Sequence, residues 1–111
     1  MSEQRAVDLG SKAPAFVLKA QTGEPVSLES FAGSKNVVLY FYPKDETPGC
    51  TFEACAFRDL ETELTNHDAV VLGVSLDSTD SHASFALNHQ LPFRLLSDTD
   101  ASVSRLYDVY H

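Results

Sequence analysis

Two cysteines, the only ones in the chain, stand five residues apart at positions 50 and 55. Cys50 follows a Pro-Gly turn and a strand-like apolar run, and Cys55 lies in a stretch with helical periodicity. Cys50 is therefore expected in the first turn of a helix, where unpaired backbone N–H groups and the helix dipole favour an anion. Because the thiolate is the reactive form of cysteine, this placement predicts redox chemistry.

Two residues upstream of Cys50 could complete a reactive site. Thr47 precedes Cys50 by three residues, so its hydroxyl is close enough to hydrogen-bond a thiolate or a bound oxygen. Pro43 fixes the backbone where the strand ends, and its ring can shield one side of a pocket. We take Cys50, Cys55, Thr47 and Pro43 as the candidate site residues.

The spacing of the cysteines constrains how they could pair. On an ideal helix, residues five apart differ by about 140° and about 7.5 Å of rise, which places their Cα atoms roughly 8–9 Å apart. A disulfide needs Cα atoms within about 7 Å. Cys50 and Cys55 therefore cannot bond while the helix is intact. If they do pair, the first turns must unwind, which predicts a conformational change coupled to oxidation.

Two other interpretations of the pair remain open on the residues alone. Free cysteines are often inert buried residues, and for an unselected pair that is the commoner case. The Pro-Gly turn before Cys50 instead favours access over packing. A metal site is disfavoured because the spacing is not Cys-x₂-Cys. The histidines that could complete such a site are scattered along the chain, at His67, His82, His89 and His111.

Length and composition bound the remaining possibilities. The 111 residues predict one domain, and the net charge of −8 would repel a phosphate backbone, which disfavours nucleic-acid binding. The N-terminus lacks the apolar core of a signal peptide, and no apolar run approaches the roughly 18 residues that span a bilayer. We therefore expect a cytoplasmic protein without a membrane segment. In that compartment, paired cysteines are more often catalytic or metal-binding than structural.

The elements that position the cysteines follow from hydrophobic patterning. We predict a β-hairpin followed by a β-α-β-α-β-α order, which indicates a parallel-cored α/β sheet with right-handed crossovers. The run 36–42 lacks polar alternation and is typical of a central strand buried on both faces. The loop 43–49 follows it, at the strand ends where such sheets bind ligands. The predicted strands are 15–19, 25–28, 36–42, 70–75 and 92–96; the predicted helices are 51–66, 78–89 and 101–109, with one helical turn within 27–32.

The sequence resembles the peroxiredoxin family. The family signature Pro-x-x-x-Thr-x-x-Cys is present as Pro43, Thr47 and Cys50, and residues 49–59 resemble the bacterioferritin-comigratory, or Q-type, branch. The similarity extends over nearly the whole chain. It implies a thioredoxin-like fold with an N-terminal β-hairpin, and a thiol-dependent peroxidase that needs no metal, haem or flavin.

The resemblance also implies roles for individual residues. Cys50 would be the peroxidatic cysteine, oxidised to a sulfenic acid by hydrogen peroxide or an organic hydroperoxide. Cys55 would resolve it as an intrachain disulfide, and thioredoxin or a similar dithiol would reduce that bond. Thr47 would orient the peroxide, Pro43 would shield the sulfenic acid, and Glu53 would help position a basic partner. An intrachain resolving cysteine removes the need for a dimer, so we expect a monomer.

One departure from the family pattern bears on the site. The family normally continues with an active-site arginine, a further strand pair and a C-terminal helix, but this sequence stops at His111. Arg58, Arg94 and Arg105 do not match the position of that arginine. The pattern of elements likewise ends on a helix with a sheet edge uncovered. We therefore expect a single domain, 1–111, that lacks the last strands and helix: a fragment, a natural short form, or a chain completed by a partner.

Two competing functions stay open at this level. A protein disulfide oxidoreductase is disfavoured because the chain has no Cys-x-x-Cys. A non-catalytic redox sensor is kept open by the missing C-terminal segment. Phe52 could either line the pocket or simply pack. Other aromatic residues are expected in the core, namely Phe16, Phe41, Phe57, Phe85 and Phe93.

Overall fold

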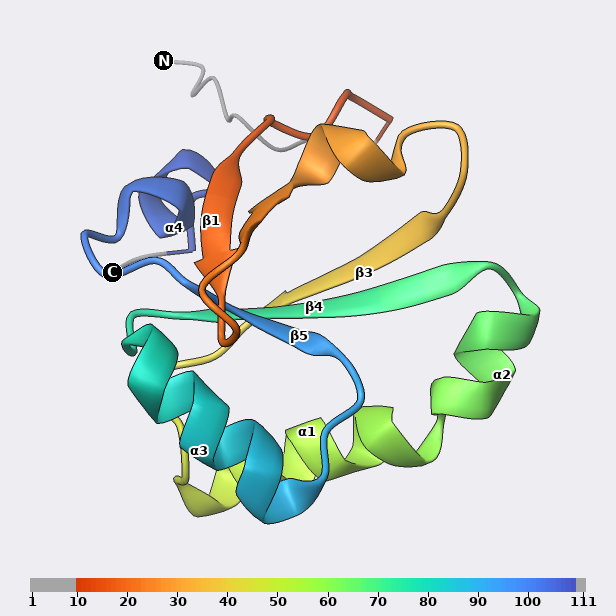
Figure 1. Ribbon diagram of the computed structural model, residues 1–111. Helices are drawn as coiled ribbons and strands as arrows, with labels where there is room; N and C mark the ends of the chain where they lie inside the picture. The colour runs from red at the N-terminus through yellow and green to blue at the C-terminus, as the bar shows by residue number, and fades with distance from the viewer. Residues whose placement is uncertain (1–9, 110–111) are drawn as a thin grey trace.

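The computed structural model of the chain describes residues 10–109, and Figure 1 shows a sheet with helices on both of its faces. In chain order the elements are β1 (Val17–Ala20), β2 (Pro25–Ser27), a 3₁₀ turn η1 (Leu28–Phe31), β3 (Asn36–Phe41), α1 (Pro48–Asp59), α2 (Glu61–Asn66), β4 (Ala69–Ser75), α3 (Thr79–His89), β5 (Arg94–Ser97) and α4 (Ser102–Leu106). This order confirms the predicted hairpin, the helical turn after it and the β-α-β-α-β-α arrangement.

The five strands form one sheet in the order β2-β1-β5-β4-β3. Strands β3, β4 and β5 run parallel, whereas β1 pairs antiparallel with both β2 and β5. Alternate residues of the buried strands face opposite sides, so Val71 and Leu95 pack under α1 and α3 while Leu72 and Leu96 pack on the side of α4. The result is two apolar layers, one on each face of the sheet (Figure 1).

The predicted central position of the run 36–42 is wrong. β3 is an edge strand whose only neighbour among residues 10–109 is β4, and none of its residues is fully buried. The most buried strand is β4, where every residue from Val71 to Ser75 is buried. An apolar run indicates that both faces of a strand are covered by other elements, but it does not indicate that both edges of the strand are paired with neighbouring strands. The free edge of β3 confirms the expected uncovered edge of the sheet.

The predicted helix 51–66 is also corrected. Helix α1 begins at Pro48, whose fixed φ suits the first helical position, and it ends at Asp59. Leu60 has φ −95° and ψ 2° and separates α1 from α2. Because Leu60 is exposed, no core contact holds it in a continuous helix. The break lies after Cys55, so both cysteines share α1.

The other two helices agree with the sequence to within a few residues. The predicted cap of α3 is present, since the Ser81 N–H donates to the Ser78 hydroxyl at 3.1 Å. Helix α4 is shorter than the predicted 101–109. Its start is fixed by the buried Asp98 carboxylate, which accepts hydrogen bonds from the N–H groups of Val103 and Ser104. A carboxylate at a helix N-terminus satisfies amides that the helix itself cannot.

Candidate active site

Cys50 is the third residue of α1, as the sequence predicts, with Thr47 at the N-cap and Pro48 at the first helical position. The thiol is less accessible than the Pro-Gly turn suggested. Cys50 is only 8% exposed because the first turn of α1 packs inward against an apolar cluster that includes Ala54, Phe85 and Phe93. The thiol therefore lies almost entirely below the surface rather than on it.

The two cysteines are free thiols on one continuous helix, with Cys55 half-buried. This is the arrangement in which an i,i+5 pair lies too far apart for a disulfide. The helix is intact at its start, where the Thr51 N–H donates to the Thr47 carbonyl at 2.8 Å. The requirement that the first turns unwind before the cysteines can pair stays a prediction.

Thr47 adopts an orientation that limits its chemistry. Its hydroxyl donates to the Lys44 carbonyl at 2.8 Å and makes no capping hydrogen bond to α1. With its proton engaged, the Thr47 oxygen can accept a hydrogen bond but cannot donate one to a thiolate. A peroxide hydroxyl is a suitable donor for that oxygen. The N–H groups of the first turn of α1 have no side-chain cap, which leaves them free to face an anion.

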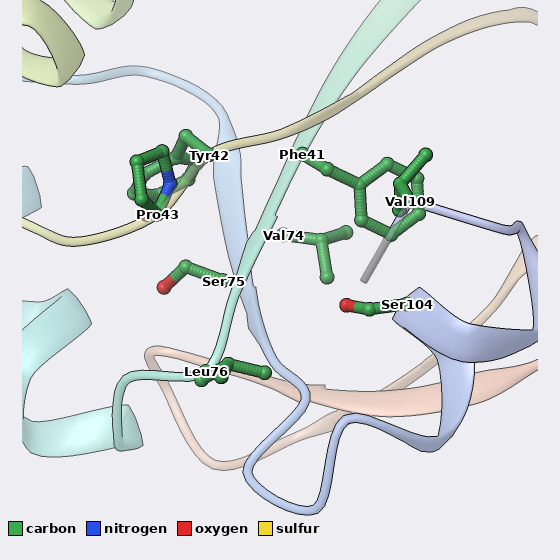
Figure 2. A pocket seen from close by; sticks show the side chains of 8 residues that line it. All are labelled: Phe41, Tyr42, Pro43, Val74, Ser75, Leu76, Ser104 and Val109. Carbon is green, nitrogen blue, oxygen red and sulfur yellow. The ribbon is translucent and has the colours of Figure 1, made fainter. Parts of the chain in front are cut away.

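Pro43 lies beside a pocket of about 480 Å³ (Figure 2). The pocket is open to solvent, and its walls come from the ends of β3 and β4 and from the region of α4. Figure 2 shows Tyr42 and Pro43 on one side of it and Val109 on the other. The lining residues are Phe41, Tyr42, Pro43, Val74, Ser75, Leu76, Ser104 and Val109. Cys50, Cys55 and Thr47 do not line this pocket, so it lies next to the predicted site rather than at the thiol.

A buried polar cluster that the sequence did not predict holds the loop before α1. Asp45, 5% exposed, accepts hydrogen bonds from the hydroxyls of Tyr42 at 2.6 Å and Ser81 at 2.9 Å. Its Oδ2 lies 2.6 Å from Nδ1 of the fully buried His82. The Asp45 N–H donates to Asp77 Oδ2 at 2.8 Å. The loop that leads to Cys50 is thus fastened to the start of α3.

The partners of His82 fix its charge. Its Nε2 lies 3.0 Å from the Leu96 carbonyl oxygen, which can only accept, so Nε2 carries a proton. Nδ1 faces the Asp45 carboxyl, whose pKa lies below its ordinary value; because an ionised carboxylate can only accept, Nδ1 also donates. His82 and Asp45 therefore form a buried ion pair. Burial raises the pKa of the Asp45 carboxyl, but the hydrogen bonds from His82, Tyr42 and Ser81 outweigh burial and hold that pKa below its ordinary value.

Among the described residues, one group has side-chain atoms close enough together to bind a metal ion: Asp45, Asp77 and His82. Both nitrogens of His82 and both oxygens of Asp45 already have partners within the protein, and these pairings account for the group without an ion. Neither cysteine belongs to it. His67 and His89 lie elsewhere, and His111 lies outside the described residues.

The lowered pKa of Asp45 predicts a specific loss of stability in acid. A carboxyl whose pKa is depressed by folding stabilises the protein above its unfolded pKa of about 4 and loses that contribution as the pH falls through the folded value. The urea midpoint of the protein should therefore fall between about pH 5 and pH 3. In Asp45→Asn it should fall less over the same interval. Equal slopes in the two proteins would contradict this assignment.

Tyr40 lies on the face of the sheet beneath α1. Its ring packs against Phe57 at a centroid distance of 4.7 Å and stacks on Tyr42 at 5.4 Å. Burial raises the pKa of its hydroxyl, and the nearby charges of Glu53 and Cys50 raise it further. The ring also crosses Gly73, where an added Cβ would come within 3.0 Å of its atoms. A side chain at position 73 would therefore force the Tyr40 ring to shift.

The remaining candidates do not converge on the thiol. Phe52 is 79% exposed, so it does not pack in the core, and it is not among the residues that line the pocket beside Pro43. Glu53 is exposed as well. Of the arginines, Arg58 donates to the His89 carbonyl and Arg94 pairs with Glu24 at 3.1 Å. Of the core predictions, Phe16, Phe85 and Phe93 are buried, and Phe41 and Phe57 are partly buried.

Comparison with known proteins places this arrangement in a family. The model of the AhpC/TSA family matches residues 9–111. The chain is 48% identical to peroxiredoxin Bcp of Bacillus subtilis and 52% identical to the chloroplastic peroxiredoxin Q of Sedum lineare, over 94% and 93% of its length. The chain belongs to the AhpC/TSA family and, within it, to the peroxiredoxins of the Bcp or Q branch.

The solved structures agree with the predicted thioredoxin-like fold. The bacterioferritin comigratory protein of Xanthomonas campestris, studied for its alkyl peroxide reduction activity, superposes on 86% of the chain with a TM-score of 0.84 and 38% identity. The chain spans 66% of the Bacillus protein, 55% of the Sedum protein and 60% of the Xanthomonas chain. Within residues 10–109, every helix is too short or too polar to cross a membrane.

Proposed function

We propose that the protein is a thiol-dependent peroxidase that reduces hydrogen peroxide and organic hydroperoxides. The observation that carries this proposal is the position of Cys50 as the third residue of α1. The backbone amides of that first turn have no side-chain cap. Thr47, three residues before Cys50, has a hydroxyl oxygen that can only accept a hydrogen bond. Amides stabilise the thiolate and the threonine oxygen holds the peroxide hydroxyl, which aligns the two reactants. The relative from Xanthomonas supports an organic hydroperoxide as one substrate.

The proposed reaction begins with the Cys50 thiolate attacking the terminal peroxide oxygen. A sulfur–oxygen bond forms, the oxygen–oxygen bond breaks, and the leaving alkoxide or hydroxide takes up a proton to become alcohol or water. Cys50 is oxidised to a sulfenic acid. Pro43, next to the loop that carries Thr47, shields this product from bulk water.

The second half of the cycle belongs to Cys55. Its thiolate attacks the sulfenic sulfur, a disulfide forms, and hydroxide leaves as water after protonation. Thioredoxin or a similar dithiol then reduces the disulfide and is itself oxidised. The disulfide itself forms within one chain, in keeping with a monomer in the cytoplasm. Peroxide consumption over many turnovers with a thioredoxin system tests the whole cycle; oxidation that stops at one equivalent would instead favour the redox sensor.

Formation of the disulfide should be visible as a loss of helix. Cys50 and Cys55 can approach only if the start of α1 unwinds, which removes about two helical turns. One equivalent of peroxide should therefore reduce the far-ultraviolet circular dichroism signal at 222 nm, and a dithiol should restore it. Cys55→Ser is the matched control, because it is oxidised at Cys50 but cannot form the disulfide. An equal loss of signal in that variant would contradict the coupling.

A further inference from the structure

The last turn of α3 holds both ends of the segment that contains the cysteines. Upstream of Cys50, the Glu46 carboxylate lies 2.8 Å from Asn88 Nδ2 and 2.9 Å from His89 Nε2. Downstream of Cys55, the Arg58 guanidinium donates to the His89 carbonyl at 2.8 Å. Residues 47–57, which contain both sulfurs, therefore lie between two attachments to the same short stretch of chain.

The upstream attachment holds a backbone conformation that the residue itself disfavours. Glu46 has φ 64°, in the left-handed region that few residues other than glycine adopt readily. The contacts of its carboxylate with Asn88 and His89 offset this backbone strain. These contacts also lower the pKa of the Glu46 carboxyl, in the order Asn88 and then His89.

At the start of this segment, Cys50 is the one buried residue of the first turn, and Pro48 and Gly49 are exposed. The N-cap residue Thr47 makes no side-chain cap, and a side chain at Gly49 would meet nothing within 4 Å. Farther along α1, Ala54 is fully buried and Phe57 packs on Tyr40. Loss of the Glu46 contacts would therefore release the first turn before any other part of the helix.

We propose that Glu46, Asn88 and His89 are positioning residues that keep the start of α1 helical for attack on peroxide and thereby slow the formation of the Cys50–Cys55 disulfide. This inference rests on the proposed peroxidase function. Peroxide attack needs Cys50 held at the helix start, whereas attack by Cys55 on the sulfenic sulfur needs that start unwound. The Arg58 contact confines the unwinding to residues before it.

The test is a single-turnover experiment that separates the two chemical steps. The double variant Asn88→Ala/His89→Ala removes both partners of Glu46 but leaves the His89 carbonyl for Arg58. Samples are mixed with one equivalent of hydrogen peroxide, quenched in acid, alkylated and analysed by mass spectrometry for thiol, sulfenic acid and disulfide. Ser84→Ala, on an exposed position of the same helix, is the control.

The double variant should form the disulfide about three- to tenfold faster than the parent, a change that corresponds to the loss of two partly exposed hydrogen bonds. It should also oxidise Cys50 more slowly than the parent. Ser84→Ala should match the parent. If these residues had a merely structural role, the double variant would slow both steps. That result, or unchanged disulfide formation with normal oxidation of Cys50, would overturn this inference but not the proposed function. Failure of the parent itself to oxidise at Cys50 would overturn the proposed function and the inference with it.

Discussion

Replacing Cys50 by serine is expected to reduce peroxide consumption to the rate of the uncatalysed reaction. A serine hydroxyl in the same first turn of α1 does not ionise near neutral pH, so it cannot attack the peroxide oxygen even though the uncapped amides and Thr47 remain in place. The measurement is peroxide loss over time with a thioredoxin system, for the parent and for Cys50→Ser at equal concentration.

Cys55→Ser is the informative partner of that variant. It should consume one equivalent of peroxide and then stop or slow sharply, with its intact mass increased by one oxygen atom at Cys50. If Cys50→Ser consumed peroxide as fast as the parent, the assignment of Cys50 as the attacking sulfur would be contradicted. Full turnover in Cys55→Ser would contradict only the role of the resolving cysteine.

The second large effect is expected at the buried pair of Asp45 and His82. His82→Ala leaves the Asp45 carboxylate buried without its charged partner, and breaking such a pair costs about 3–5 kcal/mol of unfolding free energy. Urea unfolding of the reduced protein, followed by circular dichroism, measures the loss. A cost under about 1 kcal/mol would show that the pair is not ionised as the hydrogen bonds indicate.

A matched variant separates the charge from the packing. Asp45→Asn/His82→Gln removes both charges and keeps polar groups of similar size, so it should be less destabilising than His82→Ala. Because the Asp45 loop leads to Thr47 and Cys50, His82→Ala should also oxidise Cys50 more slowly at a temperature where it remains folded. A fully active but destabilised His82→Ala would assign the pair to stability alone.

The parts of the fold that the sequence predicts are those with local signals. The hairpin, the alternation of strands and helices and the Ser78 cap each depend on residues close in sequence, and all three are present. The same holds for the cysteine helix, since Pro48 and Gly49 mark its start independently of the rest of the chain. The family signature adds the roles of single residues, which no local pattern would provide.

The position of β3 and the contacts of Asp45 and His82 depend on pairings far apart in sequence. The apolar side chains of β3 predict covered faces, but which strand lies beside it is decided by the whole sheet. His82 lies 37 residues from Asp45, so no local pattern around either residue identifies the other as its partner. Its spacing to Phe85 and His89 puts it on the inward face of α3, where a buried histidine needs a polar partner. The position of His82 on this inward face is the sequence feature that indicates a buried polar partner.

The burial of Cys50 shows a second limit of local reasoning. A Pro-Gly turn predicts a bend and an accessible backbone, and Pro48 and Gly49 are indeed exposed. The next side chain turns inward because α1 packs against Phe85 and Phe93, which come from segments more than thirty residues away. The reactive group and the turn that presents it thus have different environments.

Peptide mapping after oxidation with one equivalent of hydrogen peroxide tests the central claim most directly. The protein is digested under conditions that preserve disulfides, and the linked peptides are identified by mass spectrometry before and after treatment with a dithiol. We predict a disulfide between Cys50 and Cys55 within one chain, absent from the reduced protein and reversed by the dithiol. A Cys50–Cys50 bond between two chains, or thiols that peroxide leaves unoxidised, would contradict the account.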